Sequence, residues 1–288
     1  MQAGDIKKVC VIGAGTMGHQ ISMCFALKDF KVACTDVSQE MLNKAQEFTR
    51  TYLQDRVAKG KFSRDQADQA LANLSFVQSL EEAAEDTDFV IEAVVEKLDV
   101  KRKLFAELDR IAPPHAILTT NSSFIVSSKV ADVVKRPDRV CNMHFFNPAL
   151  AMKLVEVVQG PHTSRETAQV TMDLCIKLGK IGVWLKKEIY GFLVNRILTA
   201  ITHEALFLAD IGIASPEEID IAVVNALGHP NGPFRVMDLI GVDLAYYVDM
   251  ERYQETRDPQ DKPSPLVVEK FVKREWGMKT KKGFYQYE

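Results

Sequence analysis

The feature that most constrains this chain is a glycine pattern near its start, in the stretch KKVCVIGAGTMGHQISMCFALKDFKVACTDVS. Gly13, Gly15 and Gly18 form a G-x-G-x-x-G pattern directly after the apolar run Val9 to Ile12. The first glycine permits a tight turn, the second lets the backbone approach a pyrophosphate, and the third lets a helix pack closely on the strand. The amino terminus of that helix would face the phosphates. The pattern favours a dinucleotide-binding turn, and a glycine turn without a ligand is the alternative.

An acidic residue follows the next strand-like run. Asp36 ends the run Lys31 to Thr35 and lies eighteen positions after Gly18. A carboxylate at this place can accept hydrogen bonds from a ribose 2′-hydroxyl but repels a 2′-phosphate. The predicted cofactor is therefore NAD rather than NADP.

Further β-like runs alternate with helical or loop segments through the first part of the chain. They cover residues 88–96, 116–120 and 138–146. This alternation predicts an α/β domain over residues 1–186, with a doubly wound, Rossmann-type parallel sheet. Ligands bind such sheets beyond the carboxyl ends of the strands. At those ends the chain carries Glu96, the NSS stretch that ends at Ser123, and His144.

A helical hairpin is predicted as an insertion at about residues 38–74. Apolar residues recur at helical spacing from Met41 to Tyr52, and Ser63 with Gln66 forms a capping-box pattern for a second helix. The basic residues of the hairpin are Arg50, Arg56, Lys59 and Lys61. They form either a solvated helix face or a contact with ligand phosphates, and the pattern leaves both open.

From residue 187 to 288 the pattern is typical of an all-α domain. Apolar residues between Val194 and Leu208 mark one packed helix face, and Asn195 lies off that face. The stretch SPEE at 215–218 predicts the start of another helix with a capping box, and a further helix is expected after HPNGPF. A helical domain of this size leaves much apolar surface, so we expect it to form a homodimer.

The composition is that of a globular protein, with 47% hydrophobic and 26% charged residues among 288. A formal net charge of −3 gives no general attraction to nucleic acid or to an anionic membrane. No apolar run reaches the roughly 18 residues of a membrane span, and the chain start lacks a signal-peptide pattern. The five cysteines lack metal-ligand spacing. We therefore expect buried thiols, no metal site and a cytoplasmic protein.

The stretch CNMHFFNPALAMKLVEVV, residues 141–158, carries the clearest candidates for catalysis. His144 lies among aromatic residues, and Glu156 lies twelve positions later inside an otherwise apolar run. If the flanking segments are neighbouring strands, the two side chains can meet. A neutral imidazole can then take a hydroxyl proton while the carboxylate fixes its tautomer and stabilises the imidazolium. The alternative is a satisfied core histidine and a surface glutamate on an edge strand.

Motifs along essentially the whole chain resemble the 3-hydroxyacyl-CoA dehydrogenase family, in particular the short bacterial type that acts on 3-hydroxybutyryl-CoA. In chain order they are GAGTMG, VIEAVVEKLDVKRKLFAELD, TTNSS, MHFFNPALAMKLVEVV, GFLVNRIL, HPNGPF, DLIGVD and GFYQY. The resemblance implies an oxidoreductase that transfers a hydride between NAD(H) and C3 of a short-chain 3-hydroxyacyl-CoA or 3-ketoacyl-CoA.

The resemblance also implies roles for individual residues. His144 matches the general base and acid, and Glu156 matches the carboxylate that orients it. Ser123 and Asn195 match the polar groups that hold the reacting oxygen. The matches to cofactor contacts are Glu96, Lys101, Asn147 and Lys279. The approximate matches to basic positions that meet the CoA phosphates are Arg50 and Lys59.

The chain departs from the family pattern at three positions. Tyr190 stands where the family commonly has proline before the Gly-Phe pair, and Lys281 stands where it usually has glycine. Phe124 follows Ser123 where the family often has a second serine. None of the three departures removes a chemical group from the expected mechanism.

Two other functions fit the same residues. One is an NAD-dependent dehydrogenase of a sugar acid or other hydroxy acid on the same scaffold, which would not depend on a CoA group. The other is a non-catalytic NAD-binding protein whose helical domain serves assembly or regulation.

Overall fold

The computed structural model describes all 288 residues, and it divides into two compact units, Met1–Leu193 and Val194–Glu288. The division lies seven residues after the boundary expected at residue 186. The reason is that the segment after the last strand stays packed on unit 1, where Phe192 is fully buried. None of the helices is both long enough and apolar enough to cross a membrane.

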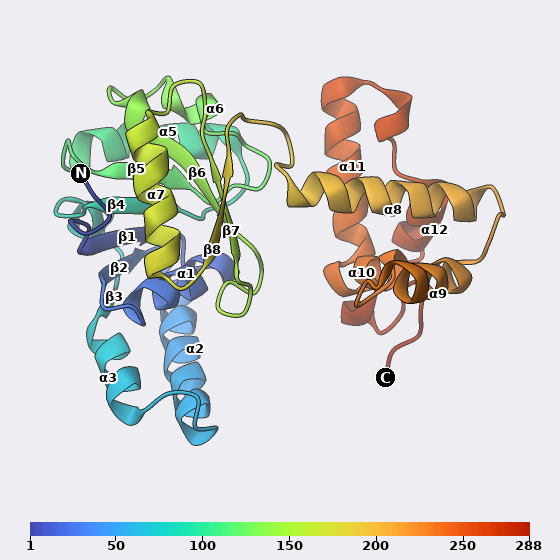
Figure 1. Ribbon diagram of the computed structural model, residues 1–288, viewed down its shortest axis with the longest axis horizontal. Coiled ribbons are helices and arrows are strands. Elements are labelled where there is room, and N and C mark those ends of the chain that lie inside the picture. Colours follow the sequence, from blue (N-terminus) through green and yellow to red (C-terminus); the bar gives the residue numbers. More distant parts are fainter. The chain divides into compact units, whose positions relative to one another are not determined.

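Unit 1 is built on one eight-stranded sheet with the order β3-β2-β1-β4-β5-β6-β7-β8 (Figure 1). Its strands are β1 (Lys8–Ile12), β2 (Lys31–Thr35), β3 (Leu74–Val77), β4 (Phe89–Glu92), β5 (Ile117–Thr120), β6 (Val140–Phe145), β7 (Leu154–Val158) and β8 (Ile181–Leu185). All neighbours pair in parallel except β6 and β7, which are antiparallel. The chain extends from β1 first toward β3 and then back toward β8. This reversal at β1 is where doubly wound sheets bind ligands, and it confirms the predicted fold class.

Two details of the sheet differ from the prediction. β3 lies directly after the hairpin, where no strand was predicted, because a four-residue edge strand is too short for its alternation to stand out. The run at 88–96 is a strand only to Glu92. Beyond it the Ala93 N–H still donates to the Ile12 carbonyl, and the chain then leaves the sheet.

Helices cover both faces of the sheet. They are α1 (Thr16–Ala26), α2 (Gln39–Ala58), α3 (Arg64–Ala72), α4 (Leu80–Ala84), α5 (Leu98–Ile111), α6 (Ser128–Ala131), η1 (Pro137–Arg139) and α7 (Arg165–Lys177). Phe25 of α1 and Leu174 of α7 belong to the core on one face, and Phe105 of α5 belongs to the core on the other. α2 and α3 project from the sheet as the predicted hairpin (Figure 1). The capping box of Ser63 and Gln66 starts α3.

Unit 2 is entirely helical. Its elements are α8 (Val194–Asp210), α9 (Pro216–Leu227), α10 (Pro233–Ile240), α11 (Val242–Thr256), η2 (Pro259–Asp261), α12 (Pro265–Val272) and η3 (Met278–Thr280). The predicted capping box starts α9, with Ser215 as N-cap and Glu218 as its partner. Leu206, Phe234 and Val267 belong to a separate core. Each unit therefore has its own buried apolar centre.

The buried carboxylate of Asp238 binds the C-terminal tail of unit 2. Asp238 accepts hydrogen bonds from the backbone N–H groups of Phe284 and Tyr285, at 2.9 Å each, and from the Tyr287 hydroxyl. A Cβ atom at Gly283 would lie 2.0 Å from the Asp238 carboxylate. Only glycine therefore allows the tail to approach Asp238 this closely.

Candidate nucleotide site and catalytic cluster

The glycine turn after β1 is closed against the sheet and open toward solvent. Gly13 has φ +100°, and a Cβ atom there would lie 2.5 Å from the Ala93 carbonyl oxygen. A Cβ atom at Gly18 would lie 1.7 Å from the Gly13 carbonyl oxygen, so α1 packs directly on the turn. Gly15 has nothing within 4 Å of its Cβ position, and as the N-cap of α1 it has no side chain to cap the helix. The first N–H groups of α1 are thus available to a phosphate.

Asp36 braces the glycine turn from the end of β2. Its Oδ2 accepts a hydrogen bond from the Ala14 N–H at 2.8 Å, and its Oδ1 accepts one from the Ser38 N–H at 2.9 Å. An ionised carboxylate has about four acceptor sites, so both oxygens can still accept from a ribose hydroxyl. The turn, the helix start and the acid together fit a bound NAD.

His144 and Glu156 face each other across the antiparallel β6–β7 pair, in which they are register partners. The His144 Nδ1 lies 2.8 Å from the Glu156 Oε2, and both side chains are buried. Because the carboxylate accepts, Nδ1 carries the ring proton and Nε2 is left as an acceptor. The alternative of a surface glutamate on an edge strand is wrong, since Glu156 is fully buried on β7, between β6 and β8.

A serine hydroxyl completes this cluster. The Ser123 Oγ lies 3.1 Å from the His144 Nε2 and comes from the loop after β5. The second oxygen of Glu156, Oε1, accepts a hydrogen bond from the Leu193 N–H at 3.0 Å. Hydroxyl, imidazole and carboxylate therefore stand in line, contributed by three separate segments of unit 1.

Aromatic rings flank the imidazole. The ring centroids of Phe146 and Phe192 lie 4.7 and 5.3 Å from that of His144. Phe192 is fully buried. These rings limit the access of water to the histidine, which strengthens its interaction with the carboxylate.

A buried ion-pair network lies behind the serine loop. The Lys101 Nζ is 2.6 Å from Glu92 and 3.2 Å from Glu96, and both Lys101 and Glu92 are fully buried. Glu96 accepts hydrogen bonds from the Ser122 hydroxyl and from the backbone N–H of Phe124. Burial alone would raise the pKa of Glu96, but the Lys101 charge and these hydrogen bonds outweigh it and lower that pKa below 4.5.

The remaining predicted residues lie apart from this cluster or in the other unit. Asn147 is exposed on the connection between β6 and β7. In unit 2, Asn195 is the second residue of α8, and Lys279 of η3 pairs with Asp243. The Lys279 ammonium also lies 5.5 Å from the centre of the Trp276 ring.

Arg50 and Lys59 do not form one basic site. They are nine positions apart on α2 and its C-cap, and at about 100° per residue they point to opposite sides of the helix. Arg50 is exposed, and the Lys59 ammonium pairs with Asp55 at 2.8 Å. One phosphate group cannot contact both cations.

Sequence reasoning missed two residues next to the cluster. Glu92 is the buried partner of Lys101, and Phe192 packs against His144. Glu92 carries the same signal that singled out Glu156, a carboxylate inside an apolar run. Phe192 carries no comparable signal, because an aromatic residue in an apolar stretch is ordinary core composition.

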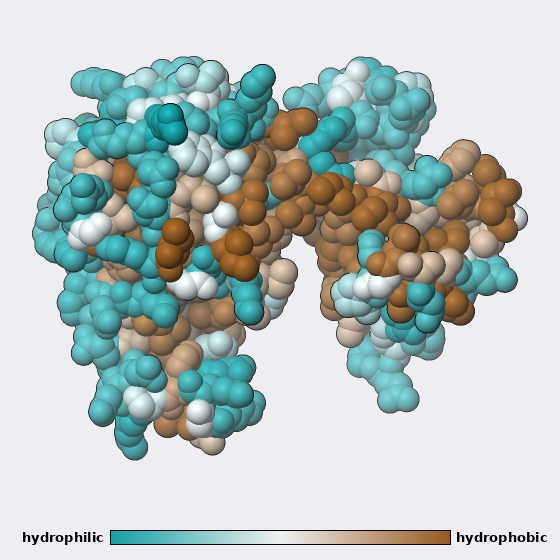
Figure 2. Space-filling model, viewed as in Figure 1, coloured by the Kyte–Doolittle hydropathy of each residue, from teal (hydrophilic) through white to brown (hydrophobic).

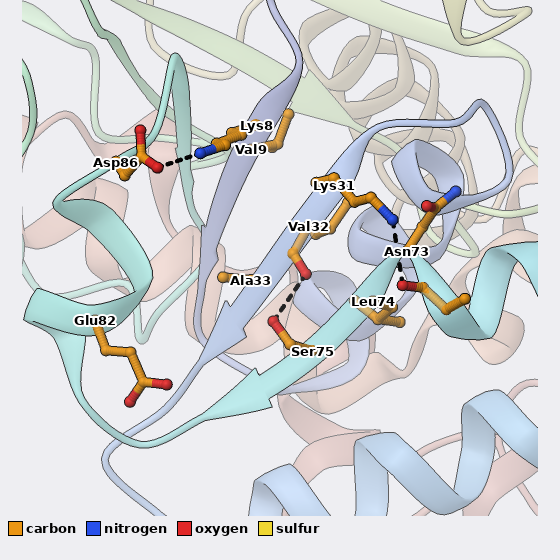
Figure 3. Close-up of a pocket in the computed structure, with 11 residues that line it drawn as sticks. Lys8, Val9, Lys31, Val32, Ala33, Asn73, Leu74, Ser75, Glu82 and Asp86 are labelled. Carbon is orange, nitrogen blue, oxygen red and sulfur yellow. Dashed lines mark hydrogen bonds and ion pairs between the residues drawn. The ribbon is translucent and has the colours of Figure 1, made fainter.

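A shallow pocket lies at the opposite, amino-terminal ends of β1, β2 and β3 (Figure 3). Among its polar side chains, Lys8 pairs with Asp86, and the Ser75 hydroxyl donates to the Val32 carbonyl. Because the glycine turn lies at the carboxyl end of β1, this pocket is not part of the candidate nucleotide site.

Comparison with known proteins gives a consistent result over the whole chain. Residues 8–189 match the family model described as "3-hydroxyacyl-CoA dehydrogenase, NAD binding domain", and residues 191–287 match "3-hydroxyacyl-CoA dehydrogenase, C-terminal domain". A probable 3-hydroxybutyryl-CoA dehydrogenase of Bacillus subtilis is 39% identical over 99% of this chain and 98% of its own. The crystal structure of (S)-3-hydroxybutyryl-CoA dehydrogenase from Ralstonia eutropha is 36% identical, with a TM-score of 0.92 over 99% of this chain and all of its own.

Proposed function

The chain belongs to the 3-hydroxyacyl-CoA dehydrogenase family, and from this premise we propose how this NAD-dependent dehydrogenase acts. Its substrate pair is a short-chain 3-hydroxyacyl-CoA and the matching 3-ketoacyl-CoA, of which 3-hydroxybutyryl-CoA and acetoacetyl-CoA are the simplest. Similarity over nearly the full length to proteins named for 3-hydroxybutyryl-CoA supports this choice. It speaks against the sugar-acid dehydrogenase and the non-catalytic alternative.

The residues of the glycine turn would hold NAD. The open space at Gly15 and the start of α1 suit the pyrophosphate, and Asp36 suits the adenosine ribose. When bound, NAD supplies the acceptor and donor of the hydride. Glu96, Lys101, Asn147 and Lys279 are proposed as further cofactor contacts, and the structure supports a second role for Lys101, which holds Glu92 and Glu96.

The line of hydroxyl, imidazole and carboxylate is the observation that carries the mechanism. In the oxidation, the His144 Nε2 takes the proton of the substrate hydroxyl, and Glu156 stabilises the imidazolium through Nδ1. In the reduction, the imidazolium returns that proton to the oxygen at C3. Ser123 lies on the side of His144 where the oxygen must bind, so its hydroxyl can donate to that oxygen. Asn195 is proposed as a second donor.

The hairpin is proposed to meet the CoA phosphates on one side only. Because Arg50 and Lys59 point in opposite directions, they would not meet the same phosphate group. Lys59 shares its side of α2 with Tyr52 and Arg56, whose guanidinium lies 4.8 Å from the centre of the Tyr52 ring. That side carries two cations, both paired with Asp55, next to an aromatic ring, and we propose Lys59 as the phosphate contact.

Replacement of His144 tests the mechanism. We expect His144→Ala to lower turnover of acetoacetyl-CoA by at least about 100-fold, the lower range for loss of a general acid or base. Binding of NADH, measured by its fluorescence, should be retained because the glycine turn is untouched. Turnover close to that of the wild type would refute the assignment.

The substrate class is tested by following the absorbance of NADH as it is consumed with each candidate substrate. Acetoacetyl-CoA should be reduced, whereas free acetoacetate should not, because the proposed binding depends on the CoA group. Equal rates with both would favour a dehydrogenase of free hydroxy acids. Binding of NADH without turnover of either compound would favour the non-catalytic alternative.

We also propose a cytoplasmic location and a homodimer. All five cysteines are buried and none is bridged, which suits a reducing compartment. Burial raises the pKa of the Cys24 thiol to about 11 and that of the Cys141 thiol to about 12, so these thiols are unreactive near neutral pH. The homodimer is supported by the apolar surface of unit 2.

A further inference from the structure

The segment between β8 and α8, residues 186–193, is fixed to the catalytic side of unit 1 at alternate residues. The Glu188 Oε1 accepts hydrogen bonds from the Ser127 hydroxyl and the Ser128 N–H, at 2.8 Å each. The Tyr190 ring lies against the Phe124 ring, with centroids 5.0 Å apart and planes tilted by 32°. The next residue in this alternation, Phe192, packs against His144. We call residues 188–193 the clamp segment.

The backbone of the clamp segment is strained where it approaches the histidine. Gly191 has φ +71° and Phe192 has φ +49°, both in the left-handed region. This region is costly for a large aromatic residue, and it persists only where surrounding contacts fix the chain. The Leu193 N–H bonded to Glu156 supplies one such contact just after Phe192. The contact of Tyr190 with Phe124 supplies another just before it.

Phe124 connects the clamp segment with the residue that would hold the substrate oxygen. It directly follows Ser123, whose hydroxyl lies 3.1 Å from the His144 Nε2. On one side this loop is held by Glu96, which accepts the Phe124 N–H at 3.2 Å. On the other side it is held by Tyr190. Both Phe124 and Tyr190 are positions at which the chain departs from the family pattern.

We propose that the contact between Phe124 and Tyr190 is a positioning pair for catalysis, which rests on the proposed function of Ser123 and His144. The pair joins the loop that carries Ser123 to the segment that packs on His144, so it sets the distance from the serine hydroxyl to the imidazole. Neither ring carries a group that reacts. A displacement of about 1 Å in such a site can lower the rate by about 100-fold, so loss of this support should reduce turnover without removing it.

The test is a double-mutant cycle with Phe124→Ala, Tyr190→Ala and the variant that combines them. We expect each single variant to lower kcat for acetoacetyl-CoA about tenfold, with the KM for NADH unchanged. The double variant should be no slower than the slower single variant, because both substitutions remove the same contact. The matched control is Tyr190→Phe, which keeps the ring and should retain wild-type kcat.

Rates are expressed per NADH-binding site, titrated by fluorescence, so that a loss of folded protein does not count as a loss of turnover. Wild-type kcat in Phe124→Ala would overturn the proposal, and so would effects that multiply in the double variant. If Phe124→Ala fails to bind NADH, Phe124→Leu replaces it in the cycle, and if Tyr190→Ala fails, Tyr190→Leu replaces it, with the same expectation. His144→Ala separates the two proposals: if it lowers turnover at least about 100-fold while Phe124→Ala keeps wild-type kcat, only the positioning role fails.

Discussion

Glu156 uses its two oxygens for different partners. Oε2 orients the His144 ring, and Oε1 accepts the Leu193 N–H at the end of unit 1. The residue that follows, Val194, begins α8. One buried carboxylate thus fixes both His144, the proposed base, and the last residue before the helix that carries Asn195. This explains why an acid occupies the middle of the apolar strand β7, where burial without partners would be costly.

Replacement of Glu156 by glutamine should lower turnover by at least about tenfold. The amide keeps the shape of the side chain, but it lacks the negative charge that stabilises the imidazolium. Turnover of acetoacetyl-CoA under saturating NADH measures the effect. Glu166→Gln is the matched control, since Glu166 is exposed and pairs only with the amino terminus of the chain. Equal turnover of Glu156→Gln and the wild type would contradict the role.

Glu92→Gln should destabilise unit 1 by about 3 kcal/mol, because removal of one partner leaves the buried Lys101 charge with Glu96 alone. Glu92 also accepts the Thr120 hydroxyl and the Val94 N–H, at 2.7 Å each. Urea unfolding followed by circular dichroism gives the free energy of unfolding. The control Glu40→Gln breaks the exposed pair with Lys44 and should cause no measurable change. A loss below about 1 kcal/mol for Glu92→Gln would show that the pair is not needed.

At the residue scale, the sequence was informative where a residue type conflicts with its surroundings. His144 and Glu156 stand out because a titratable ring and a carboxylate occur in apolar stretches, whereas the role of Ser123 was predicted only from the family resemblance. Glu92 shows the same conflict, and its partner Lys101 lies on α5, outside the apolar run. Helical periodicity alone predicts that Arg50 and Lys59 lie on opposite sides of α2, so the sequence could have shown that they do not form one basic site.

At the element scale, prediction succeeded where a local interaction determines the structure. The capping boxes that start α3 and α9 involve residues three positions apart, so the pattern and the structure coincide. β3 was missed because a short edge strand is defined by its pairing with β2, more than forty residues away. Lys281 adopts φ +63°, a left-handed backbone conformation that favours glycine. The chain therefore keeps the conformation that a glycine would adopt at this position, although the residue is lysine.

Glu275 makes a pH-dependent contribution to the stability of unit 2. It pairs with Lys270 of α12 and with Lys282 of the C-terminal tail. Hydrogen bonds from Lys270 and Lys282, at 2.8 and 2.7 Å, lower the pKa of Glu275 from 4.5 to about 2. A carboxyl group whose pKa is lower in the folded state stabilises the fold above its unfolded value. This contribution is present above pH 4.5 and is lost as the pH falls toward 2.

The wild type should therefore be more stable than Glu275→Gln at pH 7, and the difference should shrink between pH 4.5 and pH 2. Chemical unfolding of both proteins at several pH values measures this difference. Glu255→Gln serves as the control, because Glu255 is exposed on α11, and its difference from the wild type should not change with pH. A constant difference for Glu275→Gln would contradict the pairing.

At the scale of the whole molecule, the change near residue 186 from alternating strands and helices to helices alone predicts two parts. In the structure each part buries its own core. The boundary between the parts was less predictable. Residues 186–193 have no regular structure and belong to unit 1 only through long-range contacts, among them those of Glu188 and Phe192. Such contacts leave no periodic pattern in a sequence.

Unit 2 exposes several large apolar side chains on α8, on α9 and on the turn between them. Figure 2 shows apolar residues gathered over α8 and the turn that follows it. The large apolar residues of α8, α9 and the intervening turn that are more than half exposed are Ile197, Phe207, Ile211, Ile213, Ile221 and Leu227. A contiguous apolar surface of this kind marks an interaction site in soluble proteins. A second copy of the same chain, paired around a twofold axis, is the simplest partner that would cover it.

Light scattering after gel filtration should therefore give a mass near twice 32.3 kDa for the wild type. Phe207→Asp combined with Ile221→Asp should shift the mass to that of the monomer, because a buried charge without a partner opposes association. The matched control is Ile176→Asp on α7, an apolar residue of unit 1 that is also more than half exposed, and this variant should remain dimeric. A wild-type mass of 32.3 kDa at micromolar concentration would show that the apolar surface of α8 and α9 serves another contact. Retention of the dimer by the double variant would place the interface elsewhere on the chain.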